Sequence, residues 1–78
     1  MATLKDLETA AREAQERFIA QRERMAGAER VARDAINEHA RVHAQVIGGA
    51  GTQSDVGRAA AARDAAIAEL DAIRAELM

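Results

Sequence analysis

Apolar side chains recur at alternating spacings of three and four residues along the first half of the chain, and the pattern stops at a glycine-rich segment. Its members are Leu4, Leu7, Ala11, Ala14, Phe18, Gln21, Met25, Ala28, Ala32, Ala35, His39, Val42 and Val46, of which only the glutamine and the histidine are polar. This apolar stripe is typical of a long helix that packs against another helix. A shorter helical pattern follows the glycines. The sequence therefore predicts an all-α fold, an unequal antiparallel helical hairpin with coiled-coil-like packing.

The long helix has a clear beginning and end in the sequence. Thr3 and Asp6 have the spacing of a capping box, in which the hydroxyl accepts a hydrogen bond from a first-turn amide and the carboxylate accepts one from the cap amide. Glycines at positions 48, 49 and 51 end the helix, since glycine adopts the left-handed conformation of helix C-termini without steric cost. We therefore expect this helix over about residues 3–47.

The short helix is expected over about residues 54–78. Its N-cap has two alternatives, Thr52 together with Asp55 or Ser54 alone, and the sequence does not separate them. The whole chain, residues 1–78, then forms a single domain, close to the lower size at which one hydrophobic core is sufficient for folding.

Gly27 interrupts the long helical pattern and leaves an alternative fold open. Glycine costs about 1 kcal/mol relative to alanine inside a helix, so a break at this position would produce a three-helix bundle. The apolar stripe, however, keeps its phase from Met25 to Ala28 across the glycine, whereas a loop normally shifts the phase. A continuous helix is therefore the favoured interpretation.

A hairpin turn centred on residues 49–52 brings together antiparallel neighbours whose residue numbers sum to about 101. Large side chains then mostly face small ones, which lets alanine-rich helices pack closely. The expected pairs are Val42 with Ala59, Ala35 with Ala66, Ala32 with Leu70, Ala28 with Ile73 and Met25 with Leu77. Charge favours the same register, because residues 17–33 are mainly basic and residues 64–78 mainly acidic. The expected ion pairs are Arg30 with Asp71, Arg33 with Glu69 and Arg24 with Glu76.

At this register the short helix reaches only to about Met25, so residues 3–22 extend beyond it without a neighbour from their own hairpin. We call these residues the overhang. Its polar face places Glu and Arg four residues apart, a spacing that favours pairing along the helix. An apolar stripe left in water is typical of an interaction surface. The candidate partner-binding residues are Leu4, Leu7, Ala11, Ala14, Phe18, Ile19 and Arg22.

The composition indicates that a single copy of the chain has a thin core. Of the 38 hydrophobic residues 21 are alanine, and Phe18 is the single aromatic residue, so little apolar area is available for burial. Self-association or a larger partner protein is the expected remedy. Between these, we expect a dimer in which two hairpins pack antiparallel as a four-helix bundle.

Sequence features that direct a protein out of the cytoplasm are missing from the chain. It contains no cysteine, no apolar run of about 18 residues and no charged-then-apolar leader. We therefore expect no disulfides, no membrane partner and a cytoplasmic location. The bias toward Ala, Arg and Gly, with a single Lys, indicates a bacterial or phage gene, so this cytoplasm is that of a bacterium or a phage-infected host cell.

His39 and His43 lie four residues apart on one helix face, a spacing able to bind a transition metal. A site needs further ligands, and the nearest candidates in the expected register are Asp55 and Asp64. The His-Glu-x-x-His order of metalloproteases is absent. We interpret the pair as structural, with no metal and no cofactor, and leave open that protonation of a histidine in the stripe weakens assembly as pH falls.

Several arginines of the long helix are candidates for a nucleic-acid surface. They are Arg12, Arg17, Arg22, Arg24, Arg30 and Arg33. Glutamates alternate with them, and an arginine already paired with a glutamate releases few counterions from DNA. The formal net charge is −2, and no stacking aromatic residues accompany the arginines. Nucleic acid is therefore a disfavoured partner.

The sequence contains no recognisable catalytic arrangement. The turn Gly48-Gly49-Ala50-Gly51-Thr52 lacks the Gly-Lys-Ser/Thr ending and the preceding strand of a phosphate-binding loop. We therefore expect a non-enzymatic protein–protein interaction module, such as an adaptor, assembly factor, virion component or inhibitor, with no small-molecule substrate. It would self-associate or dock on a larger protein through the apolar stripe. The alternative function is a nucleic-acid-associated regulator that uses the Arg-rich face of a helical dimer.

Overall fold

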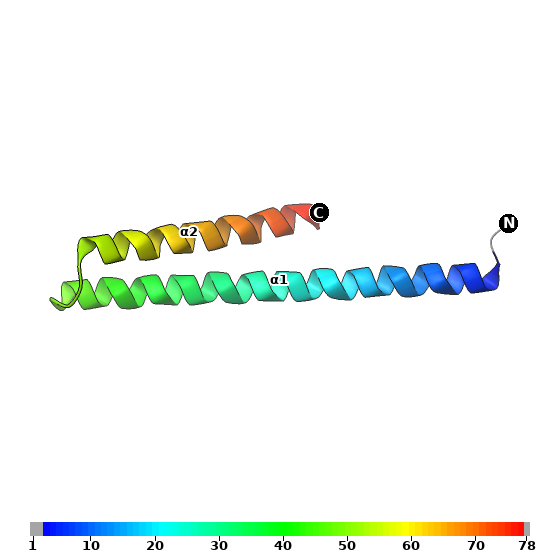
Figure 1. Cartoon of the computed structure of the whole chain (residues 1–78), viewed down its shortest axis with the longest axis horizontal. Coiled ribbons are helices and arrows are strands. Elements are labelled where there is room, and N and C mark those ends of the chain that lie inside the picture. The colour runs from blue at the N-terminus through cyan, green and yellow to red at the C-terminus, as the bar shows by residue number, and fades with distance from the viewer. Residues whose placement is uncertain (1–2, 78) are drawn as a thin grey trace.

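The computed structural model describes residues 3–77, which form two antiparallel helices joined by a short loop (Figure 1). Helix α1 spans Leu4–Ile47 and helix α2 spans Gln53–Glu76. The molecule is a thin rod of 71 × 15 × 14 Å. The predicted all-α, unequal antiparallel hairpin is confirmed, while the expected end of the short helix at residue 78 lies outside the described residues. Within those residues, neither helix is long and apolar enough to cross a membrane.

Both helices begin with the same capping motif. The Thr3 hydroxyl accepts a hydrogen bond from the Asp6 amide (3.2 Å), and the Asp6 carboxylate accepts one from the Thr3 amide (3.0 Å). Thr52 and Asp55 repeat both bonds at the same distances. Each box satisfies amide donors that have no partner inside the helix. The structure thus selects Thr52, and not Ser54, as the cap of α2.

The loop between the helices depends on two of its glycines. Gly49 and Gly51 have φ angles of 88° and 105°, a left-handed region that glycine enters without a side-chain clash. Gly48, which we also expected to be left-handed, instead ends α1 with an ordinary φ of −77°. The Ala50 amide then donates to the Gln45 carbonyl (2.8 Å), which satisfies one of the free carbonyls at the helix end.

Helix α1 runs without interruption through Gly27, so the three-helix alternative is wrong. The continuous phase of the apolar stripe across the glycine predicted an unbroken helix, whereas the low helix propensity of glycine predicted a break. A methyl group added at Gly27 would meet no atom within 4 Å. No close contact therefore requires glycine at this position.

The two helices meet along a narrow apolar contact, which we call the seam. Its centre is the cluster of Ala32, Ala66 and Leu70, and Ile73 is also buried, with 3% of its surface exposed. The half-buried residues around the cluster are Met25, Ala28, Ala35 and Ile67. Alanines of α1 thus face leucine and isoleucine of α2, which is the large-to-small packing that the sequence predicted.

Two polar contacts across the seam confirm the predicted register. The Arg24 guanidinium lies 2.5 Å from the Glu76 carboxylate, near the C-terminal end of α2. Closer to the loop, the Arg63 guanidinium lies 3.3 Å from Nδ1 of His39. These contacts lie at different heights along the rod. Together they show how the two helices are aligned over most of the length of α2.

The other two expected ion pairs are not formed among residues 3–77. Asp71 lies 3.8 Å from Arg74 of its own helix, and not beside Arg30. Glu69 lines the same groove as Arg30, whereas Arg33 is not part of that groove. Helix alignment was predicted correctly, but it does not determine on which side of the seam a long, exposed side chain extends. Pairs of this kind contribute little free energy to fix their geometry.

Candidate interaction surface

The overhang is the part of α1 that α2 does not cover (Figure 1). Helix α1 has 44 residues and α2 has 24, so the difference corresponds to about 30 Å of helix. From residue 3 to residue 22, every residue is exposed except Thr9, which is half-buried. The exposed fractions of Leu4, Leu7 and Phe18 are 74%, 60% and 58%. The structure thus places large apolar side chains in water at one end of the rod.

These side chains continue the line of residues that forms the seam. Leu4, Leu7, Ala11, Ala14 and Phe18 follow the same alternating spacing as the seam residues of α1, without a change of phase. On a helix this spacing keeps side chains on one slowly drifting face. One surface of α1 is therefore buried by α2 in its second half and exposed in its first half.

Phe18 and Arg22 form a local contact that the apolar pattern of the sequence does not predict. The Arg22 guanidinium carbon lies 5.8 Å from the centre of the Phe18 ring. A cation over an aromatic ring at an exposed site contributes about 0.5–1 kcal/mol. The four-residue spacing of the two side chains was the available signal. The contact places the Arg22 guanidinium beside the Phe18 ring on the overhang.

Ile19 lies on the flank of the overhang and not on the stripe itself. Its neighbours in a shallow depression are Arg22, Glu23 and Ala26. Adjacent residues of a helix are rotated by about 100°, so Ile19 points away from the face that carries Phe18. With 47% of its surface exposed, it widens the apolar surface at one edge.

Two further exposed apolar residues of α1 lie beside the seam, Val31 with 57% and Ile36 with 44% of their surface exposed. They are five residues apart, which places them about 140° apart around the helix. They therefore do not form one continuous face. The spacing of the apolar stripe does not reveal them, because they lie outside it.

The two histidines lie together, but the other predicted metal ligands are committed elsewhere. The rings of His39 and His43 stack at a centroid distance of 6.1 Å. Asp64 lies 3.0 Å from the Arg63 guanidinium, and Asp55 belongs to the capping box. Among residues 3–77, no group of three His, Cys, Asp or Glu side chains is arranged to hold a metal ion. The histidine pair therefore contributes to the seam through His39, which contacts Arg63 of α2.

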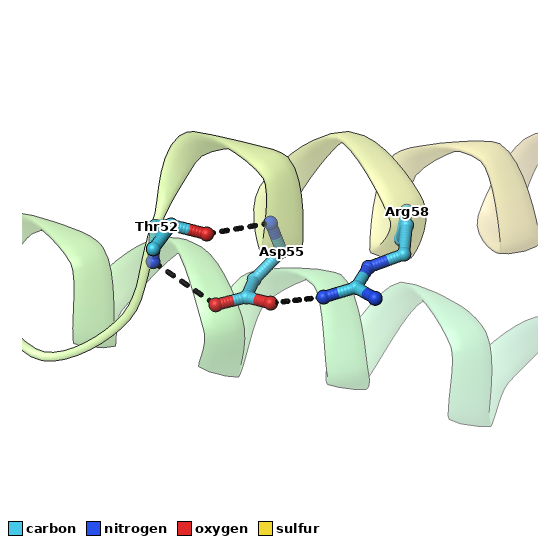
Figure 2. Close-up of polar contacts among 3 residues, drawn as sticks. All are labelled: Thr52, Asp55 and Arg58. Carbon is cyan, nitrogen blue, oxygen red and sulfur yellow. Dashed lines mark hydrogen bonds and ion pairs between the residues drawn. The ribbon is translucent and has the colours of Figure 1, made fainter.

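Asp55 illustrates how the charges near the loop serve the fold. Its carboxylate accepts hydrogen bonds from the Thr52 amide and from the Arg58 guanidinium, and its own amide donates to the Thr52 hydroxyl (Figure 2). These interactions, the Thr52 amide first, lower the pKa of Asp55 below its ordinary value of 3.8. The polar groups around the glycine-rich turn are thus used for capping α2.

The arginines of α1 do not form one basic face. Of the six candidates, only Arg24 makes an ion pair among the described residues. The pairs expected within the overhang, such as Glu8 with Arg12 and Glu13 with Arg17, are not formed in that part of the structure, as is common for solvated side chains. Helical spacing also distributes the six arginines around α1, with glutamates between them. This arrangement gives phosphate groups no continuous basic strip.

Comparison with known proteins adds no relative: no family model, no curated protein and no solved structure matches the chain significantly. Function is therefore inferred from the geometry of the hairpin and of the overhang.

Proposed function

We propose that the chain is a non-enzymatic protein–protein interaction module that binds its partner through the overhang. The observation that supports this most directly is the continuity of the apolar stripe, which is buried by α2 at one end and exposed at the other. Exposed apolar surface of this regularity carries a cost in water that a partner helix removes. Such a surface is needed for each of the roles in question, which are adaptor, assembly factor, virion component and inhibitor. The proposed location is the cytoplasm of a bacterium or of a phage-infected host cell.

Within this surface, Leu7 and Phe18 are the expected anchors. Both side chains are large, and more than half of each is exposed, so a partner gains most of its hydrophobic contact by covering them. An anchor of this type contributes about 2–4 kcal/mol when it is central in an interface. Ala11 and Ala14 lie between the anchors, and their small side chains allow a partner helix to approach closely.

The alternative function, nucleic-acid binding through the Arg-rich face, has no particular contact in its favour. A salt titration with duplex DNA separates the two proposals. Binding that weakens steeply as salt rises would support the nucleic-acid regulator, whereas no binding at low salt would exclude it.

Site-specific photo-crosslinking in the producing cell tests the proposed function. A photoreactive amino acid replaces Phe18 in one variant and Ala65, an exposed residue of α2, in the matched control. We expect a discrete protein adduct from position 18 and none from position 65. Absence of an adduct at position 18, or equal adducts from both positions, would contradict the proposal.

A further inference from the structure

The geometry points to a specific occupant of the overhang, and we infer that it is the overhang of a second copy of this chain, aligned antiparallel. This inference rests on the proposed function, because it names the partner of the same surface. In the resulting dimer, the second copy's α1 continues along the line of α2 and covers the exposed half of the stripe. Each chain covers the other in the same way, so the contact is two-fold symmetric.

The lengths of the helices fit this arrangement. Helix α2 ends beside Met25, where Leu77 lines one depression with Met25 and Arg22. The space beyond this point accommodates an antiparallel helix that begins opposite Gln21, and the overhang of a second copy supplies one from Leu4 onward. The negative end of the α2 dipole then faces the positive end of the second copy's α1, which is favourable.

The apolar residues are complementary to themselves when reversed. Antiparallel overhangs aligned so that residue numbers sum to about 25 place Leu7 opposite Phe18 and Ala11 opposite Ala14. Symmetry repeats each contact, so the two large pairs flank a central region of small residues. Leu4 then faces Gln21, the one polar member of the stripe in the overhang, near the solvent-exposed end of the contact. The same alternation of large and small side chains forms the seam inside each hairpin.

The charges at the edges of this contact do not oppose it. In heptad terms Arg17 flanks the stripe on one side and Glu8 on the other. At the antiparallel alignment, flanking residues of the same side face each other, so Arg17 lies nearest Ala10 of the second copy and Glu8 lies nearest Gln15 of the second copy. No like charges meet at these flanking positions.

Two other dimers fit the surface less well. A parallel dimer would bring Arg17 against Arg22 of the second copy, a like-charge contact that the antiparallel alignment avoids. A four-helix bundle would need an apolar outer face on the hairpin, but Val31 and Ile36 lie on different sides of α1. The outward face of α2 carries mainly alanines, which bury little area: Ala61, Ala65, Ala68, Ala72 and Ala75. The structure therefore favours pairing at the overhang over the four-helix bundle that composition suggested.

The shape of the wild-type protein in solution is the first test. A dimer joined only by the overhangs is a rod of about 110 Å, much longer than the 71 Å of one chain. Multi-angle light scattering and small-angle X-ray scattering at tens of micromolar should give twice the mass of one chain and this maximum dimension. A monomer would overturn the inference, and so would a dimer no longer than one chain.

Charges introduced opposite Arg17 test the alignment. Ala10→Glu places a glutamate beside Arg17 of the second copy, whereas Ala10→Arg places an arginine there, and symmetry repeats each contact. Ala10→Glu should therefore dimerise about tenfold more tightly than Ala10→Arg. Positions 10 and 17 are seven residues apart on one helix and do not pair within a chain, so the difference reports the contact between copies.

Analytical ultracentrifugation of the two variants should show the tighter dimer for Ala10→Glu. Equal affinities, or a tighter dimer for Ala10→Arg, would overturn the antiparallel alignment. Circular dichroism of each variant checks that both remain helical.

A wild-type chain that is monomeric in solution, yet forms an adduct with another protein from position 18, would overturn the inference and leave the proposed function standing. Absence of any adduct at position 18 would remove both.

Discussion

The two halves of α1 carry the same spacing of apolar residues but lie in opposite environments. In the covered half, Ala32 is 4% exposed beneath α2, whereas in the overhang Leu7 is 60% exposed. At its centre the covered half has alanines on the stripe and receives leucine and isoleucine from α2. The overhang holds its own large residues, Leu7 and Phe18, and has no neighbour within the hairpin.

On the proposed function, the stripe serves two separate contacts. The seam is intramolecular, and its formation does not require the overhang, because the buried residues of the described chain all lie between positions 32 and 73. Substitutions on the same stripe should therefore have separable consequences. Those beneath α2 should change the free energy of unfolding of the hairpin, and those in the overhang should change association.

The largest expected effect on folding is that of Leu70→Ala. Leu70 is 7% exposed at the centre of the seam, and truncation of a buried leucine costs about 2–4 kcal/mol. In so thin a core this loss should unfold much of the hairpin at 37 °C, as measured by thermal and urea melts followed by circular dichroism. Ile36→Ala is the matched control, since Ile36 is 44% exposed. Equal losses from the two variants would contradict the assignment of the seam.

The double variant Leu7→Ala and Phe18→Ala tests whether the overhang contributes to association and not to folding. Removal of both anchors should weaken association by about 4 kcal/mol or more, because their side chains are the main apolar area of the overhang. Analytical ultracentrifugation measures this change. The melting of residues 25–77 should remain close to wild type when compared at concentrations where both proteins are monomeric. If the double variant instead unfolds as a monomer, the overhang belongs to an internal core.

Gly27→Ala should stabilise the chain at the junction of the two halves. A methyl group there meets no atom within 4 Å, and alanine favours a helix interior by about 1 kcal/mol over glycine. The expected result is a higher melting temperature. Gly49→Ala is the contrasting control, because the φ of 88° at that glycine disfavours any side chain, and it should lower the melting temperature.

The smallest expected effect comes from the capping boxes. The pKa of Asp55 is lowered in the folded chain, first by the Thr52 amide and then by Arg58, so its ionised form favours folding. This contribution is complete above the ordinary pKa of 3.8 and is lost as pH falls from there through the lowered folded pKa. Asp55→Asn should therefore lower the melting temperature at pH 7 by less than about 5 °C.

The pH dependence of this variant provides the check. Melting temperatures measured from pH 6 to pH 2 should converge for wild type and Asp55→Asn in acid. Asp6→Asn removes the same kind of cap from the overhang, where the Thr3 amide lowers the pKa of Asp6. It should affect the first turn of α1 and leave the hairpin transition almost unchanged. A larger shift from Asp6→Asn than from Asp55→Asn would contradict the separation of the two halves.

Most of the fold was predictable because the decisive signals are local or periodic. The Thr3 and Asp6 box, the glycine turn and the phase of the stripe each depend on nearby residues. The register was predictable because large and small residues alternate in opposite order on the two helices. The position of Arg24 against Glu76 followed from that register.

What the sequence did not reveal depends on side-chain direction around the helix. Asp71 lies beside Arg74 and not beside Arg30, and Arg63 lies beside His39. Both contacts depend on the rotamers of long side chains, which residue spacing does not determine. The exposure of the candidate surface was inferred from the unequal helix lengths. Helix geometry alone places Ile19 on the flank, whereas the depression that it lines with Arg22, Glu23 and Ala26 became clear only from the folded helix.

The glycine loop has a practical consequence for work with this protein. It lies at the end of α1 opposite the overhang, at the far end of a 71 Å rod (Figure 1). The loop residues 48–52 are all exposed, and such loop tips tolerate insertions well. A fluorophore, affinity tag or second protein fused there would stay clear of any molecule bound to residues 3–22. The hairpin is thus suited to serve as a rigid spacer of fixed length, attached to cargo at its loop.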